Sequence, residues 1–353
     1  MRDALVDLIY NARMALRRVS IRDVAREANV SITTVSRVVN DTGYPVTPDV
    51  RQRVQQAVAN LGYVPNLSAR HLRKVHADVL GLIVRDIANP YYGEIAKGVT
   101  ERAIEYGYLV FVCSTGRDPE VELRHYEMLS QHRVKGIVLA GGGLISPRHA
   151  EVFREQVARR ASSGVTIIGL APQAAHVPLV SVDFRQLVDT MVSYLCSLGH
   201  RNIGLVTGRR DVATCEHHVE GYSRALRHNN LTFNPALLSY QDFTEEGGYA
   251  GSNELLEKNA DITAICAGSD TIAMGVLQAA RHRNLHVPRD VSVIGIGDLP
   301  PARFCSPALT TMRVPRYEMA SRAVDLICGS EELTPEHWFS PQLIERGSVA
   351  DIR

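Results

Sequence analysis

Several features that assign proteins to specialised classes are scarce in this sequence of 353 residues, which holds one tryptophan, 6% aromatic residues and a net charge of +1. With 45% hydrophobic residues, so small a net charge excludes intrinsic disorder. Lys, Arg, Asp or Gly interrupts every apolar run before the roughly 18 residues that a membrane span requires. Asp3, Asp7 and Arg13 interrupt the region where a secretory signal would have its apolar core. We therefore expect a folded cytoplasmic protein of two or three compact units, with no membrane partner.

The cysteines are also few and scattered. None of the six forms a C-x-x-C pair or a Cys/His spacing typical of metal sites. Free and mostly buried thiols in a reducing compartment are the simplest interpretation, so the sequence indicates neither a metal site nor a disulfide framework. The residues are Cys113, Cys196, Cys215, Cys266, Cys305 and Cys328.

The small net charge hides an asymmetry between the two ends of the chain. Residues 1–76 hold 12 Lys and Arg against 6 Asp and Glu, whereas the remainder holds 27 against 32. A basic amino-terminal segment on a mildly acidic body is typical of a protein with one end that meets a polyanion. Because basic tails are common, the charge asymmetry alone does not establish binding to a polyanion, and the local sequence pattern of the segment is needed as well.

Two short helices with a three-residue turn between them are predicted for residues 20–39. Ser20 and Asp23 have the spacing of a capping box, and Ser31 is placed to cap the second helix. The apolar residues of both helices face each other, which is the pattern of a helix-turn-helix. The outward face of the second helix is small, hydroxylated and basic, as suits a helix in a major groove. It carries Ile32, Thr33, Ser36 and Arg37.

A third helix is predicted to close this small core. Thr47 would cap it, Pro48 would take its first position and Gly62 would end it. Its apolar stripe is Val50, Val54, Val58 and Leu61. The alternative is a helical mini-domain without DNA contact.

The segment around these helices resembles a known family. The stretches VSIRDVAREANVSITTVSRVVN and YVPNLSARHL look like the DNA-binding head of the lactose/purine repressor (LacI-type) family, and the resemblance extends from about residue 19 to 348. It implies that Ile32, Thr33 and Arg37 read bases, Arg37 by a bidentate bond to guanine. It also implies phosphate contacts by Ser31, Thr34, Ser36 and Asn40.

The same resemblance implies a hinge helix at residues 66–73, with Ala69 in the minor groove and Leu72 wedged between base pairs. Ordinary packing of Leu72 against the next domain is the alternative. The expected division is an extension at 1–18, a helix-turn-helix domain at 19–64, a hinge at 65–76 and an effector domain at 77–353. Residues 1–13 have no counterpart in the family pattern, and Met14 is an alternative start.

From residue 79 onward, short apolar runs alternate with amphipathic segments. This rhythm predicts parallel sheets with helices on both faces, and about 275 residues fit two lobes with a ligand cleft at the strand ends. The family's periplasmic-binding-protein-like core has this form. The predicted strands are 79–84, 109–113, 136–140, 165–170, 180–182, 203–207, 264–266 and 291–295, and the clearest helices are 93–106, 121–131, 187–198, 216–229 and 271–283.

The resemblance also places an effector site in that cleft. The loop 85–92 contributes ligand contacts in the family, which makes Asn89, Tyr91 and Tyr92 candidates, the tyrosines for stacking on a ring. Their alternative role is a hydrophobic patch that closes the lobe interface. Asp183 and Ser269 match family positions near the cleft, as does Asp270, whose place at a helix start is explained equally well by capping.

The polar ligand residues of the family are where this sequence departs. His218 stands where the family has an arginine, Gly297 stands at a carboxylate position with Asp298 one residue later, and residues 169–171 include no acid. Fewer carboxylates favour an anionic effector such as a sugar acid or sugar phosphate, to which a protonated His218 would donate. The alternative is that Asp298 performs the usual role and the ligand is a neutral sugar.

An enzyme is the competing class of function. Gly295 and Gly297 follow a strand, but Pro300 replaces the third glycine of a dinucleotide loop, and residues 141–143 lack the Lys-Ser/Thr of a phosphate loop. A periplasmic solute-binding protein would need a signal peptide and no basic head. We therefore expect a ligand-responsive repressor without cofactor.

The expected assembly is a homodimer, because one head covers half of a palindromic double-stranded operator. Residues 346–348 match a strand-like close in the family, and no leucine-heptad tail for tetramers follows. The identity of the effector, and whether it releases the protein from DNA or promotes binding, stay open at this level.

Overall fold

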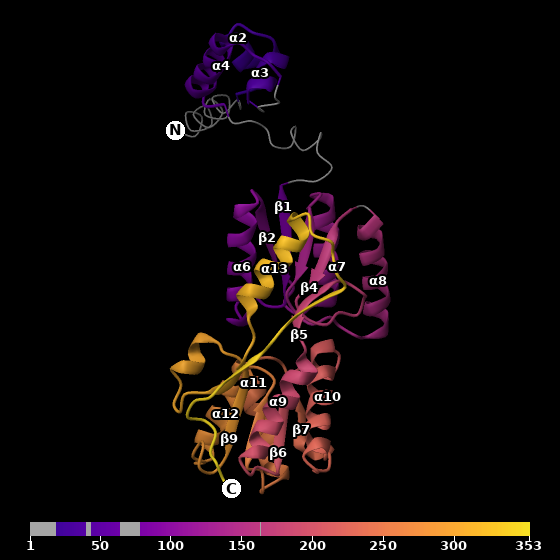
Figure 1. Ribbon diagram of the computed structural model, residues 1–353, viewed down its shortest axis with the longest axis vertical. Coiled ribbons are helices and arrows are strands. Elements are labelled where there is room, and N and C mark those ends of the chain that lie inside the picture. Colours follow the sequence, from indigo (N-terminus) through magenta and orange to yellow (C-terminus); the bar gives the residue numbers. More distant parts are fainter. Residues whose placement is uncertain (1–18, 40–43, 64–77, 163) are drawn as a thin grey trace, which may run out of the picture. The chain divides into compact units, whose positions relative to one another are not determined.

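The computed structural model describes residues 19–39, 44–63, 78–162 and 164–353 (Figure 1). The chain divides into two compact units, Met1–Val75 and His76–Arg353. Helices alone form the described part of the first unit, whereas strands and helices alternate through the second. In these ranges, no helix is both long enough and apolar enough to cross a membrane.

The first unit has three described helices, α2 (Ile21–Glu27), α3 (Ile32–Val39) and α4 (Pro48–Leu61). They share one small core, in which Val24 and Val35 are fully buried. The other buried members are Ala25, Ala28, Val38, Val54 and Ala57. The helix-turn-helix and the third helix predicted from the sequence are confirmed. The buried face of α4 also includes Ala57, which was not among the predicted apolar residues of that helix.

Residues next to the ends of these helices determine where each helix begins or stops. The backbone amide and hydroxyl of Ser20 donate to the Asp23 carboxylate at 2.9 and 2.6 Å, so the capping box is confirmed. At the start of α3, the Thr34 amide donates to the Ser31 hydroxyl at 3.1 Å. Thr47 holds the cap position of α4 but makes no capping hydrogen bond through its side chain. Gly62 ends α4 with a left-handed φ of +60°.

The first lobe of the second unit is a six-stranded parallel sheet in the order β11-β5-β4-β3-β1-β2. Its strands are β1 (Val79–Val84), β2 (Leu109–Ser114), β3 (Gly136–Leu139), β4 (Thr166–Gly169), β5 (Leu179–Val182) and β11 (Glu336–Phe339). Alternate residues of β1 serve opposite faces: Leu80 and Leu82 belong to one core, and Val79 and Ile83 to another. Such two-sided burial explains the continuous apolar run of this strand.

Helices cover both faces of this sheet. One pair is α6 (Tyr91–Glu105) with α13 (Arg316–Cys328), and the other is α7 (Pro119–Gln131) with α8 (Pro147–Ser162). In Figure 1 the yellow α13 lies among the purple elements of the first lobe although it comes late in the sequence. The first lobe is therefore built from two separate stretches of chain.

The second lobe repeats the design with the strand order β12-β10-β9-β8-β6-β7. Its strands are β6 (Ile203–Thr207), β7 (Leu238–Tyr240), β8 (Ala264–Ala267), β9 (Ser292–Gly297), β10 (Thr310–Arg313) and β12 (Gln342–Ile344), and only the β10–β12 pair is antiparallel. Its helix pairs are α9 (Phe184–Ser197) with α10 (Ala213–His228), and α11 (Glu245–Lys258) with α12 (Asp270–His282).

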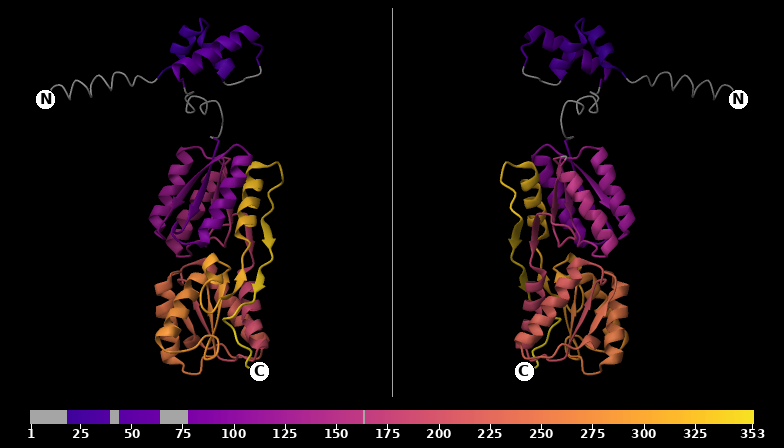
Figure 2. Two further views of the ribbon diagram at one scale, coloured as in Figure 1. Left: turned by 90° about the vertical axis from the view of Figure 1, so that its left-hand side faces the viewer. Right: turned by 90° about the vertical axis from the view of Figure 1, so that its right-hand side faces the viewer.

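The chain passes between the lobes three times, after β5, after β10 and after β11. Figure 2 shows the yellow carboxy-terminal segment along both lobes. The buried Arg316 joins them: its guanidinium pairs with Glu94 of α6 and donates to the Gly297 carbonyl at the end of β9. The same guanidinium lies 5.2 Å from the centre of the Tyr91 ring.

The predicted two-lobed α/β architecture is confirmed, with each of the eight predicted strands present within one or two residues of its expected ends. The sequence did not predict β7, β10, β11 and β12 among the strands, or α8, α11 and α13 among the helices. The strand-like close expected at residues 346–348 is wrong, because β12 ends at Ile344 and Gly347 and Ser348 form a turn.

Close packing of α11 against α12 yields a first prediction. A Cβ at Gly275 would lie 1.9 Å from the Glu245 carbonyl oxygen, which belongs to the backbone and cannot rotate away. We expect Gly275→Ala to lower the free energy of unfolding by about 1–3 kcal/mol through overpacking, as measured by chemical denaturation. The control is Gly93→Ala in α6, where a Cβ meets nothing within 4 Å. That change should raise stability by about 0.5–1 kcal/mol, and equal effects at both sites would contradict the packing described.

Candidate functional sites

The outward face of α3 is the first candidate site. Ile32 is 44% exposed, and Thr33 and Arg37 are also exposed, whereas Val35 and Val38 are buried against the other helices. The three residues predicted to read bases therefore project away from the core of their own unit. An exposed isoleucine here suits an apolar contact with a base methyl group.

Hydroxyl groups surround that face. Ser31 and Thr34 are linked through their side-chain oxygens at 2.8 Å, and Ser36 is half-buried. The Arg37 guanidinium lies 4.9 Å from the centre of the Tyr44 ring. The other residues predicted to contact DNA, Asn40, Ala69 and Leu72, lie outside the described residues, as does the predicted hinge helix at 66–73.

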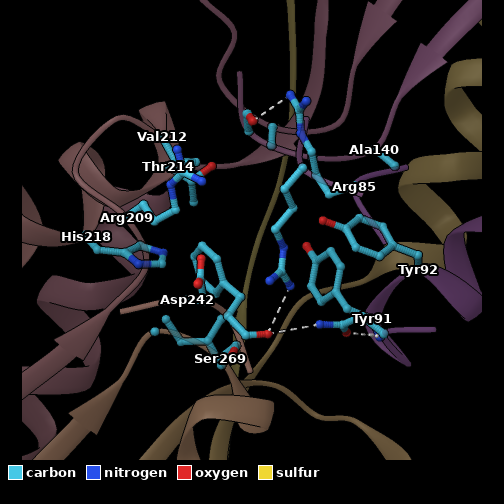
Figure 3. Close-up of a pocket in the computed structure, with 18 of the residues that line it drawn as sticks. Arg85, Tyr91, Tyr92, Ala140, Arg209, Val212, Thr214, His218, Asp242 and Ser269 are labelled. Carbon is cyan, nitrogen blue, oxygen red and sulfur yellow. Dashed lines mark hydrogen bonds between the residues drawn. The ribbon is translucent and has the colours of Figure 1, made fainter. Parts of the chain in front are cut away.

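A cavity of about 100 Å³ between the two lobes is the second candidate site (Figure 3). Most of its walls come from residues that directly follow the strands of both sheets, because the carboxyl ends of parallel strands share one edge. The described residues that line it are Arg85, Asn89, Tyr91, Tyr92, Arg117, Ala140, Gly141, Gly142, Leu144, Ala171, Phe184, Arg209, Val212, Thr214, His218, Asp242, Phe243, Gly268, Ser269 and Ile296.

Five of the seven predicted effector residues meet in this cavity. Asn89, Tyr91 and Tyr92 come from the loop after β1, His218 comes from α10, and Ser269 caps α12. Figure 3 shows the two tyrosines on one side of the cavity and His218 on the other. The tyrosine rings meet edge to face at 5.4 Å, and burial raises the pKa of both hydroxyls, so they are neutral hydrogen-bonding groups.

His218 lies in the predicted place but not in the predicted charge state. Its side chain is 1% exposed, and its Nδ1 lies 2.9 Å from the Thr207 hydroxyl. Burial, with a smaller contribution from the neighbouring His217, lowers the pKa of His218 to about 3. The expectation that a protonated His218 donates to an anion is therefore corrected, because the ring is neutral at physiological pH. Its Nε2 has no hydrogen-bond partner among the described residues.

Asp183 and Asp298 are the two predicted effector residues that do not line the cavity. Asp183 caps α9 by accepting from the amides of Arg185 and Gln186. Asp298 is buried beside three arginines: Arg346 donates to its Oδ1, Arg303 donates to its Oδ2 at 3.3 Å, and Arg313 lies 3.7 Å away. Burial opposes ionisation of Asp298, but the Arg346 and Arg303 partners lower its pKa. These carboxylates have structural partners outside the cavity lining, and their role as ligand contacts stays a prediction.

Asp270 also has a structural position. Its carboxylate accepts from the Thr311 hydroxyl at 2.5 Å and from the Leu299 amide at 2.7 Å. Burial raises the pKa of Asp270 to about 6 despite these bonds. The residue thus connects α12 to β10 and to the segment after β9.

Sequence reasoning missed the charged groups of the cavity. Arg85 pairs with the buried Glu122 and donates to the Gly142 carbonyl at 2.8 Å. Arg117 and Arg209 add two further guanidinium groups, and Asp242 adds a carboxylate. Arg85 directly follows the predicted strand 79–84, and Arg209 comes two residues after the predicted strand 203–207. These positions at strand ends were the signal that could have found them.

Two hydrogen bonds cross the cavity from the first lobe to the second. Arg117 Nη2 and Asn89 Nδ2 both donate to the main-chain carbonyl of Phe243, at 3.2 and 3.4 Å. Both are drawn as dashed lines in Figure 3. Over the part of the chain that the structure describes, no group of three or more His, Cys, Asp or Glu side chains could hold a metal ion.

Comparisons with known proteins cover both units. A family model described as "Bacterial regulatory proteins, lacI family" matches residues 20–66, and one described as "Periplasmic binding protein-like domain" matches residues 192–349. The HTH-type transcriptional regulator DegA of Bacillus subtilis (strain 168) is 34% identical over 309 residues, covering 86% of this chain and 89% of its own. The HTH-type transcriptional repressor CytR of Escherichia coli (strain K12) is 31% identical over 334 residues, covering 94% and 96%.

Solved structures agree with the fold. The transcriptional regulator CelR in complex with cellobiose has a TM-score of 0.68 and 28% identity over 94% of this chain and all of its own. The Lac repressor dimer bound to operator and the anti-inducer ONPF has a TM-score of 0.82 over 95% of this chain and all of its own, at 22% identity.

The neutral His218 predicts a dependence of stability on pH. Its pKa is about 3 in the folded protein and about 6.5 in an unfolded chain, so the unfolded state binds the proton first as the pH falls. Its contribution to stability is therefore complete above pH 6.5 and is lost as the pH falls towards 3, with about 2 kcal/mol lost by pH 5.

We expect His218→Gln to flatten the fall in unfolding free energy between pH 7 and pH 5, measured by denaturant titration at each pH. His217 and His200, whose pKa values burial also lowers, should leave part of the slope in place. The same change at the exposed His132 is the control. Identical slopes for wild type and His218→Gln would contradict the buried neutral ring.

Proposed function

Because the chain belongs to the lacI family of bacterial regulatory proteins, and is therefore a DNA-binding transcriptional regulator, we propose that it represses transcription as a homodimer on a palindromic operator. A small metabolite of the sugar, sugar acid or sugar phosphate class controls it through the interlobe cavity. The protein acts by binding alone, in the cytoplasm, without a catalytic step. Its proposed division is an extension at 1–18, a helix-turn-helix domain at 19–64, a hinge at 65–76 and an effector domain at 77–353.

The observation that carries this proposal is the outward face of α3. A helix that buries Val35 and Val38 while it exposes Ile32, Thr33 and Arg37 has side chains free to enter a major groove. Ser31, Thr34, Ser36 and Asn40 are assigned to phosphate contacts, and Ala69 and Leu72 to the minor groove.

The cavity supports control by a ligand. Residues from both lobes line it, so a bound molecule would have different contacts when the lobes move relative to each other. That differential binding is the requirement for coupling a ligand to a second activity of the same protein. We assign Asn89, Tyr91, Tyr92, His218 and Ser269, which line the cavity, to effector binding.

An exposed apolar surface supports the homodimer. The edge strand β2 and its flanking helices carry five exposed apolar side chains, a liability that an edge strand normally avoids and that a second copy would cover. We call this surface the β2 edge patch. It consists of Ile104, Leu109, Phe111, Val112 and Met128.

The DNA contact is tested with Arg37→Ala. Duplexes selected by the full-length protein from a random pool should contain a palindrome, and loss of Arg37 should cost about 1–3 kcal/mol at one base position of each half-site. Fluorescence anisotropy with single-base variants of the selected duplex measures this. The control is Arg26→Ala on α2, which removes the same charge from the same unit. Enrichment of no sequence would contradict the function, and an equal loss on every sequence would contradict base reading by Arg37.

The dimer is tested with Leu109→Asp, which places a charge in the β2 edge patch. We expect the dimer dissociation constant to rise by about 30-fold or more, because a central interface side chain is worth about 2 kcal/mol or more. Sedimentation equilibrium measures the change. Phe304→Asp in the second lobe, where the ring is 85% exposed, is the control and should leave the dimer intact. A monomeric wild type, or a Leu109→Asp variant that dimerises normally, would contradict the assignment.

A further inference from the structure

The three arginines of the interlobe cavity differ in how their charges are balanced. Arg85 pairs with Glu122, and Arg209 makes two hydrogen bonds to the Asp211 carboxylate. Arg117 has no carboxylate partner among the described residues, and the Phe243 carbonyl at 3.2 Å is the acceptor of its side chain. The cavity thus holds one guanidinium whose charge is not paired.

Asp242 does not change this balance. It is the single acidic residue among the described residues that line the cavity, and its charge acts on Arg209 together with Asp211. Among the described residues, Asp242 forms no ion pair with Arg117.

The backbone at Arg117 is in an unfavourable conformation for an arginine. Its φ is +64° and follows a φ of +58° at Gly116, a left-handed region that glycine and asparagine adopt at lower cost. The tight turn is fixed by the Arg117 amide, which donates to the Thr115 hydroxyl at 3.1 Å and to the Arg85 carbonyl at 3.2 Å. A strained backbone of this kind at a cavity wall is typical of a residue whose side chain is used for binding.

The acceptor that Arg117 now has is a weak one. The Phe243 carbonyl is neutral and also accepts from Asn89 at 3.4 Å, so two donors share one acceptor at long distances. A carboxylate or phosphate would form shorter and stronger bonds with a guanidinium, and would bind it through two parallel N–H groups. The Phe243 carbonyl is therefore a replaceable partner.

The same cavity has unsatisfied polar atoms away from Arg117. Within the part of the chain that the structure describes, His218 Nε2 and Thr214 Oγ1 are buried without a hydrogen-bond partner. When the Thr207 hydroxyl donates to His218 Nδ1, the neutral ring carries its hydrogen on Nε2 and offers a donor to the cavity. Apolar walls from Leu144, Phe184 and Ile296 complete the site.

We propose that the effector is an anionic metabolite whose carboxylate or phosphate is bound by Arg117, in place of the Phe243 carbonyl, and whose polar body bonds to His218 and Thr214. This inference rests on the proposed role of the cavity as the effector site. It differs from the sequence expectation in the residue that binds the anion, because that role passes from a protonated His218 to Arg117.

The test uses the full-length protein and three probes at equal ionic strength: inorganic phosphate, D-gluconate and the uncharged D-glucose. We expect phosphate or gluconate to raise the melting temperature Tm of the wild type by about 3 °C or more at saturation, and glucose to raise it less. A larger response to phosphate assigns a phosphorylated ligand, and a larger response to gluconate assigns a sugar acid. No response to either anion, or a response to glucose that equals theirs, would overturn the proposal.

Variants assign the response to Arg117. Arg117→Gln should abolish the anion-dependent rise in Tm, whereas the matched control Arg210→Gln, an exposed residue outside the cavity lining, should keep it. Arg117→Gly should also lose the rise, with a Tm in chloride within about 2 °C of the wild type, because glycine relieves the left-handed strain. A rise that survives in Arg117→Gln, or a large fall in the Tm of Arg117→Gly in chloride, would overturn the role of Arg117 in binding.

Binding of the selected duplex is measured in parallel. Arg210→Gln without added anion should bind DNA as the wild type does, because Arg210 lies outside the cavity lining. If the wild type binds no duplex but shows the anion response, the proposed function fails and the anion site stands. If it binds DNA but shows no anion response, the anion site fails and the proposed function stands.

Discussion

The common direction of the strands within each lobe is the constraint on which the candidate effector site depends. Parallel strands place every following loop at one edge of the sheet, and in this chain those edges line the same cavity from two sides. Arg316 fixes the two edges relative to each other through Glu94 in the first lobe and the Gly297 carbonyl in the second. Because that guanidinium is buried and joined to both lobes, a movement of either lobe has to change its contacts.

The electrostatics of the cavity follow from what surrounds each ionisable group. Glu122 is buried but stays ionised, because Arg85 and His149 outweigh the effect of burial and lower its pKa. His218 has no such partner, so burial keeps it neutral. Arg117 is left as the unpaired charge among the described cavity residues, which is why the proposed anion site is assigned to it.

Local pattern predicted the parts of the fold that depend on neighbours in sequence. The capping residue Ser20 is recognisable from its spacing to Asp23, and strand β1 from its continuous apolar run. Helix α11 was missed because it buries Gly247, Gly248 and Gly251, so that close backbone approach replaces the apolar stripe that periodicity detects.

The candidate site was predicted in its place but not in its charges. The position of His218 follows from the family resemblance, whereas its neutrality depends on its burial in the folded protein. Asp298 lies among Arg303, Arg313 and Arg346 and outside the cavity lining, and Arg346 is 48 residues away in the chain. Contacts at such separations have no signature in local sequence.

Coupling between the cavity and the DNA-binding unit is the central claim, and one measurement tests it most directly. The dissociation constant of the selected duplex is measured against the concentration of whichever anion raises the Tm, at fixed ionic strength. We predict a change of about 5- to 150-fold, with the anion affinity changed by the same factor when DNA is present. A duplex affinity that stays constant while the anion saturates the cavity would contradict it.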